Sequence, residues 1–128
     1  MHRDEAGLAT LEATLMITIL IPLLFAVIEF GDVFQRWLAQ ESATVQVARY
    51  AAELGGDAPE VHALLEESLR QSGIDPSRAT LEVMPARVGW REQLTVTVRT
   101  TAVVAIPFLF ATAIPLRTTA VVRGELAR

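Results

Sequence analysis

Apolar residues form one unbroken block near the N-terminus, whereas the rest of the chain mixes short apolar and polar stretches. Residues 13–28 carry no charge, and Glu12 and Glu29 bracket this run. As a helix the run reaches only ~24 Å, short of the ~30 Å hydrocarbon core of a bilayer. A start at Leu8 gives ~32 Å. The pattern therefore predicts a transmembrane helix over residues 8–28, with Glu12 inside it or at its edge.

The block is expected to stay in the protein as an anchor. A cleaved secretory signal has a small-x-small site after its apolar region, and residues 28–32 do not provide one. Past Gly31 the helical period continues to Leu54, and Gly55 and Gly56 are expected to end the helix. Phe34 and Trp37 could lie at the outer headgroup level or pack under the globular part. The pattern puts seven apolar residues near one helix face: Phe30, Phe34, Trp37, Leu38, Val45, Ala48 and Ala52.

A short second helix is predicted within residues 58–72. Asp57 is expected to be its N-cap, with Pro59 in the first turn, and Gly73 is expected to end it. An ion pair between Glu66 and Arg70 is expected one turn apart. Its apolar stripe consists of Val61, Leu64, Leu65 and Leu69.

The period then changes to the alternation of strands. Residues 93–99 alternate most clearly, residues 81–83 less so, and residues 117–123 read as a last strand. Trp90, in the intervening loop, is expected to cover the sheet edge. The uncharged run 102–116 is too short and too proline-rich for a second membrane pass. We interpret it as the buried end of one strand followed by an apolar loop over 106–115.

The predicted fold class is therefore α+β, with a long N-terminal transmembrane and stalk helix, a short second helix and a small antiparallel β-sheet. The expected divisions are residues 1–7, 8–28 (transmembrane), 29–54 (helix extension) and 55–128 (small α+β domain).

Composition narrows the function. The formal net charge is −4 and every basic residue is Arg, with no basic and aromatic cluster for nucleic acid. The absence of Cys excludes disulfides and thiolate metal sites. Of the two His residues, His2 lies near the start and His62 on the second helix, and no catalytic set accompanies them. We expect no enzyme activity, catalytic residue, metal, cofactor or small-molecule substrate.

Small and hydroxyl residues in the apolar block favour close helix contacts. Small residues four apart let helix backbones approach each other in lipid, and a proline is tolerated there when neighbours satisfy the freed backbone group. The alternative is that these are tolerated residues of a lone anchor. The candidate packing residues are Ala9, Thr10, Ala13, Thr14, Thr18 and Pro22.

Glu12 is the most informative residue of the block. A carboxylate in a membrane helix is costly and is rarely kept without a partner. If the chain were cut after Gly7, the new amino group of Leu8 would lie one helical turn from Glu12 and could neutralise it, from the same or a neighbouring subunit. The alternative is that Glu12 is the interfacial end of an ordinary anchor.

The start of the chain resembles the cleavage site that prepilin peptidase recognises in type IV pilins, with Gly7 before the cut and Glu12 fifth after it. The wider block is similar to the TadE/TadG-like minor pilins of the Flp, or tight-adherence, type IVb pilus. In that family a Gly-x4-Glu start leads to a central Pro-Leu-Leu, here residues 22–24, and to a Glu-Phe-Gly exit, here residues 29–31.

This resemblance implies a type IV pilin-like fold and a structural or assembly role as a minor pilin or pseudopilin in cell adhesion. It implies residues 1–7 as a cytoplasmic leader, a processing site at Gly7 and Leu8, and an assembly role for Glu12. The implied partners are the membrane, prepilin peptidase, other pilins and the tight-adherence assembly platform. The protein would be a single-pass protein of the inner membrane with an extracytoplasmic C-terminal domain, and a pilus on the cell surface is one destination. Two alternatives stay open: an uncleaved envelope protein whose small domain binds a ligand or partner, and a pseudopilin of another type IV filament or secretion system.

Overall fold

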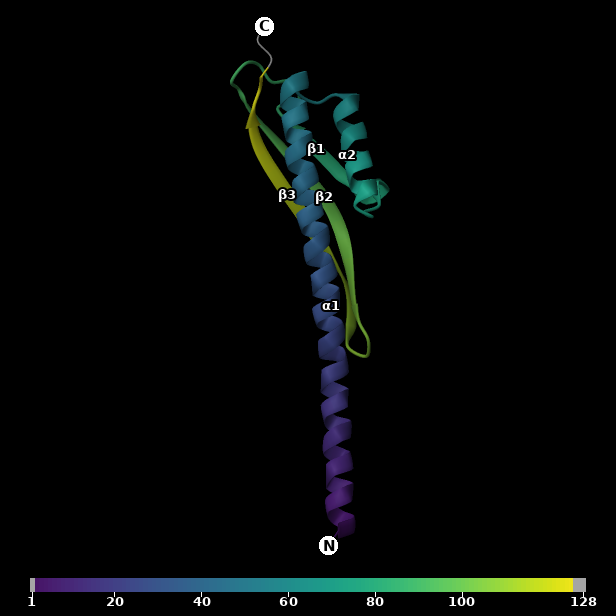
Figure 1. The fold of residues 1–128 in the computed structure, drawn as a ribbon. Helices are drawn as coiled ribbons and strands as arrows, with labels where there is room; N and C mark the ends of the chain where they lie inside the picture. The colour runs from purple at the N-terminus through teal and green to yellow at the C-terminus, as the bar shows by residue number, and fades with distance from the viewer. Residues whose placement is uncertain (1, 126–128) are drawn as a thin grey trace.

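One very long helix organises the molecule. A computed structural model of the chain describes residues 2–125. In it α1 (His2–Leu54) is a continuous helix of 53 residues. The other elements lie along its C-terminal half, and only a hairpin turn reaches beyond the middle of the helix toward the N-terminus (Figure 1). Pro22 removes one helical hydrogen bond, the one to the carbonyl of Thr18, yet the helix continues on both sides of it. After Leu54 the chain turns at Gly55 and Gly56, both of which have positive φ angles.

The second helix, α2 (Pro59–Gln71), packs on α1 and is followed by η1 (Pro76–Arg78), a short 3-10 turn. Two predictions about its polar residues are wrong. The N-cap is Ala58, without a side-chain hydrogen bond, because Asp57 instead contacts His62, its Oδ1 lying 2.7 Å from Nε2. Arg70 pairs with Glu67 at 3.1 Å and not with Glu66, since three-residue spacing on a helix brings side chains together as well as four-residue spacing does.

The sheet has three antiparallel strands in the order β1-β2-β3. These are β1 (Thr80–Met84), β2 (Gln93–Ile106) and β3 (Phe110–Arg123). β2 pairs with the short β1 over residues 95–99 and with β3 along its whole length. Beyond the end of β1, β2 and β3 therefore continue as a two-stranded hairpin that runs alongside α1 toward the N-terminus (Figure 1). The predicted α+β fold class is confirmed.

The predicted apolar loop over residues 106–115 is wrong. β3 begins at Phe110, and only Pro107, Phe108 and Leu109 connect the strands. Pro115 lies inside β3, opposite Thr101. A proline is acceptable there because β3 is an edge strand, so a missing N–H on its outer side breaks no ladder bond.

The prediction that Trp90 covers the sheet edge is wrong. Trp90 lies in the turn before β2, where it is 56% exposed, and Arg91 lies over its ring at 5.9 Å.

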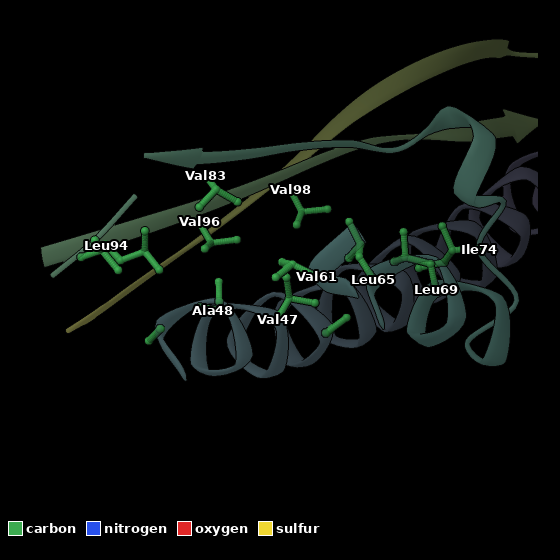
Figure 2. Packing of buried hydrophobic residues seen from close by; sticks show 14 residues of the cluster. Val47, Ala48, Val61, Leu65, Leu69, Ile74, Val83, Leu94, Val96 and Val98 are labelled. Atoms are coloured by element: carbon green, nitrogen blue, oxygen red, sulfur yellow. The ribbon is translucent and has the colours of Figure 1, made fainter. Parts of the chain in front are cut away.

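The hydrophobic core lies between the two helices and one face of the sheet (Figure 2). Alternate residues of β2 point into it, as the alternation of residues 93–99 predicts. Gly56 adds a close contact, because a Cβ there would lie 2.2 Å from the backbone oxygen of Ala86. The cluster includes Val47, Ala48 and Ala51 of α1, Val61, Leu65 and Leu69 of α2, Ile74, and Val83, Leu94, Val96 and Val98 of the sheet.

The buried face of α1 differs from the predicted apolar stripe. Phe30, Phe34, Leu38 and Val45 are all 39% exposed or more, and only Ala48 and Ala52 of the predicted set are buried. The sequence pattern misleads here because two of the buried positions are polar. The buried stripe, at three- and four-residue spacing, consists of Gln40, Ala43, Thr44, Val47, Ala48, Ala51 and Ala52.

Candidate functional site

The N-terminal part of α1 carries a large apolar surface that the rest of the chain leaves mostly uncovered. Its most apolar 18-residue window has a mean hydropathy of 2.4, and none of that window is buried. Within residues 2–125, α1 is the one helix long and apolar enough to cross a membrane. An uncovered apolar surface of this kind marks contact with a membrane or another protein. Its length and composition are those of a single membrane-spanning helix.

The predicted processing residues lie near the start of this surface. Gly7 and Leu8 are helical and exposed, with Leu8 at 68%, and a Cβ added at Gly7 would have nothing within 4 Å. Glu12 lies one turn further along the same helix and is also exposed. Among the side chains that the structure describes, none forms an ion pair or hydrogen bond with Glu12. Its carboxylate is thus directed at the surroundings of the helix.

The three threonines of the block are occupied within their own helix. Thr10, Thr14 and Thr18 donate to the carbonyl oxygens of Ala6, Thr10 and Thr14 at 2.9, 2.8 and 2.7 Å. These bonds satisfy the hydroxyls within α1, so the hydroxyls do not need a second helix as partner. Ala9 and Ala13 are exposed on α1, and Pro22 is half-buried. A helix-packing role for these six residues stays a prediction.

Phe34 and Trp37 stack on one another with ring centroids 6.0 Å apart. Phe34 is 59% exposed and Trp37 is half-buried, and neither belongs to the core cluster. The structure therefore does not pack both rings under the globular part, which was one of the two alternatives for them.

A buried polar network joins α1 to the middle of the β2–β3 hairpin. The Nε2 of Gln40 donates to the carbonyl of Val98 at 2.9 Å and to the hydroxyl of Thr118 at 3.1 Å. Its Oε1 accepts from the hydroxyl of Thr100. The hydroxyl of Thr44 donates to the carbonyl of Gln40 at 2.7 Å and lies 2.6 Å from that of Thr118. No buried side-chain nitrogen or oxygen in the described residues lacks a partner, so the network fixes how the hairpin sits on α1.

Below this network the hairpin follows α1 into the apolar block. A carboxylate oxygen of Glu29 accepts from the backbone N–H of Ala105 at 3.4 Å. Further down, Phe108 at the turn lines an open groove with Ile17, Ile21 and Pro22. The rise from Glu29 to Gln40 is ~16 Å along the helix, and that from Thr100 to Ala105 is ~16 Å along the strand. The helix and the strand therefore extend over the same distance between these two contacts.

We searched the described residues for metal-ligand groups and for titratable side chains with a shifted pKa. No group of three or more His, Asp or Glu side chains there could hold a metal ion. His62 lies on the exposed surface beside Asp57. Asp75 has a lowered pKa because it accepts hydrogen bonds from the hydroxyl and backbone N–H of Ser77, with Arg78 nearby. This arrangement closes the turn of η1.

A comparison with known protein families finds a match that lies within α1. Residues 7–49 match the model of a family described as TadE-like protein, which confirms the predicted resemblance over about a third of the chain. The matched segment begins at Gly7 and includes Glu12, Pro22 and Glu29. No curated protein and no solved structure matches the chain. The match shows that this segment is similar to TadE-like proteins.

Sequence reasoning missed three parts of this region: the polar network, the contact between Glu29 and Ala105, and the hairpin turn beside the apolar block. One signal was available for the first of them. Gln40 and Thr44 continue the spacing of Val47, Ala48 and Ala51, so the helical period alone favours their burial. The other two depend on the path of the hairpin, which local patterns do not reveal.

Proposed function

We propose that this chain is a pilin-like structural protein of a tight-adherence pilus, a minor pilin or pseudopilin. Residues 8–28 anchor it in the inner membrane, and the α+β domain lies on the extracytoplasmic side. Prepilin peptidase removes residues 1–7, and the mature protein associates with other pilins and the assembly platform. The observation that carries this proposal is the long apolar part of α1, none of whose most apolar window is buried, in the segment that matches TadE-like proteins.

The geometry at Gly7 supports processing. The peptide bond between Gly7 and Leu8 lies in α1, where both residues are exposed. A glycine weakens a helix by about 1 kcal/mol relative to alanine, which makes it easier for this bond to leave the helix and enter a protease cleft. Gly7 also has no side chain to obstruct that cleft.

The position of Glu12 supports assembly through the new N-terminus. Cleavage converts the backbone nitrogen of Leu8 into an amino group one turn from Glu12, on a surface that the rest of the chain leaves uncovered. Opposite charges attract more strongly in a low-dielectric medium. The amine of one subunit and Glu12 of a neighbour can thus neutralise each other in a bundle of anchors.

N-terminal sequencing of the protein from membranes of piliated cells tests the proposal, together with extraction of those membranes at alkaline pH. We expect the chain to remain in the membrane pellet and to begin at Leu8. A membrane-bound chain that keeps residues 1–7 would favour the uncleaved envelope protein. Release into the supernatant would contradict anchoring itself.

A further inference from the structure

We propose that the tip of the β2–β3 hairpin, residues 106–110, inserts into the outer leaflet of the membrane in which α1 is anchored, as a second contact with lipid. The inference rests on the proposed anchoring of α1 and adds a site that anchoring by itself does not require. The tip consists of Ile106, Pro107, Phe108, Leu109 and Phe110.

The position of the tip is the first argument. Phe108 lines a groove with Ile17, Thr18, Ile21 and Pro22, which belong to the predicted transmembrane segment. Whatever medium surrounds Ile17 and Ile21, which are 55% and 42% exposed, must also surround Phe108. The hairpin turn beside the lower half of α1 in Figure 1 is this tip.

The chemistry of the tip is the second argument. Phe108 is 95% exposed, Leu109 62% and Phe110 49%, and no charged residue occurs between Arg99 and Arg117. Phe108 also adopts a φ of 66°, a left-handed conformation that is strained for a bulky residue and that Gly or Asn would adopt more easily. A turn surrounded by water would gain nothing from an aromatic residue in this position.

The groove beside the tip suits an apolar occupant. Its volume is ≈ 320 Å³, and its one polar side chain, Thr18, already donates to the carbonyl of Thr14 at 2.7 Å. Lipid acyl chains can fill such a space without leaving a side-chain hydroxyl unsatisfied.

Backbone hydrogen bonding limits how deeply the hairpin tip can enter the bilayer. Open strand edges are not tolerated in the hydrocarbon core, because their polar groups find no partner there. Glu29, at the end of the apolar block, accepts from the N–H of Ala105, and within the turn Leu109 donates to the carbonyl of Ile106 at 3.2 Å. From Ala105 to Phe108 the strand spacing gives ~10 Å. That distance keeps the tip within the outer half of a ~30 Å hydrocarbon core.

Site-directed spin labelling of the full chain tests the proposal. The chain has no cysteine, so each introduced cysteine is the single labelling site. The variants are Phe108→Cys at the tip, Leu20→Cys in the apolar block and Val121→Cys at the far end of β3, the last two being 57% and 56% exposed. Each is placed at one copy per nanodisc of phosphatidylcholine and phosphatidylglycerol. Collision rates with oxygen, which enters lipid, and with a water-soluble nickel chelate are then measured.

We expect an oxygen-to-nickel collision ratio several-fold higher for the labels at residues 108 and 20 than for the label at residue 121. A label at 108 that resembles 121, while the label at 20 resembles lipid, overturns the tip insertion and leaves the anchor intact. A label at 108 shielded from both reagents places the tip against protein and also overturns it. A label at 20 exposed to water contradicts the anchor and with it this proposal.

Discussion

The side-chain amide of Gln40 donates to the backbone carbonyl of Val98 at 2.9 Å, across a separation of 58 residues in the sequence. This bond lies inside a closed network with the hydroxyls of Thr44, Thr100 and Thr118. Since α1 and the hairpin run in step below it, the network determines where the hairpin tip meets the apolar half of α1. A polar contact in the folded domain thus sets the position of a turn beside the apolar part of α1.

Replacing Gln40 should therefore destabilise the domain. Gln40→Ala takes a hydrogen-bond partner away from four groups, the carbonyls of Val98 and Leu116 and the hydroxyls of Thr100 and Thr118. It also leaves a cavity, and we expect a loss of about 2–4 kcal/mol in the free energy of unfolding. Gln46→Ala is the matched control, because Gln46 lies exposed on the same helix and should change stability by less than about 0.5 kcal/mol. Urea titration of the full chain in detergent, followed by tryptophan fluorescence, measures both. Equal stabilities would mean that the network contributes little.

Gly56 should not tolerate a side chain. Its φ is 132°, and a Cβ would lie 2.2 Å from the backbone oxygen of Ala86, which cannot move without disturbing the strand connection. We expect Gly56→Ala to lower the free energy of unfolding by about 2–4 kcal/mol. Gly31→Ala, in the helix with nothing within 4 Å, should instead raise helix stability by up to about 1 kcal/mol. Thermal unfolding of the two variants distinguishes these effects, and a stable Gly56→Ala protein would contradict the close contact.

Substitution of Gly7 should block processing. We expect Gly7→Val to leave the full-length precursor in the membrane, because a branched side chain next to the cut obstructs the peptidase cleft. Gly31→Val places the same side chain on an exposed, uncrowded part of α1 and should be processed normally. Mass spectrometry of the intact membrane-extracted proteins reports the result. Cleavage of Gly7→Val at the wild-type rate would count against a peptidase site here.

Glu12 should matter for assembly and not for insertion. Glu12→Ala removes a charge that is costly in lipid, so expression, insertion and cleavage should be unchanged. In a bundle it leaves the Leu8 amine of a neighbour buried and unpaired, a penalty of ~3–5 kcal/mol for a buried pair. We expect reduced recovery in sheared pili and in pull-downs of the assembly platform, relative to the membrane level. Glu41→Ala, on the exposed surface of the same helix, should be recovered normally. Normal recovery of Glu12→Ala would leave Glu12 as an interfacial residue only.

Asp75 gives a prediction about pH. Its pKa is lowered chiefly by the hydroxyl of Ser77, so its ionised form stabilises the turn. This contribution is present above the ordinary carboxyl range and is lost as the pH falls through the lowered pKa. Ser77→Ala should raise the pKa of Asp75 toward its ordinary value. Ser72→Ala, whose hydroxyl donates to the carbonyl of Ser68, should not change it. Titration of the Asp75 carboxyl by NMR measures the pKa in both variants.

The sequence by itself determined the features that depend on neighbours along the chain. The apolar block from residue 8 to residue 28, ~32 Å long as a helix, indicates a membrane-spanning segment. The spacing of Gly7 and Glu12 carries the resemblance that the family match confirms. The alternation of residues 93–99 identifies a strand because the side-chain period of a strand is two. The processing and assembly roles of Gly7 and Glu12 stay predictions, since they concern partners outside this chain.

Only the tertiary structure decided the features that depend on residues far apart. From the sequence alone Gln40, a polar residue, is expected on the surface. In the fold it is buried, because Thr100 and Thr118 lie next to it and satisfy its side-chain amide. From the sequence alone Pro115 is expected in a loop. The strand order places β3 at an edge of the sheet, where a strand can contain a proline. The hairpin tip reaches the apolar block because the strands and α1 extend side by side over the same distance, a relation between elements that no local periodicity contains.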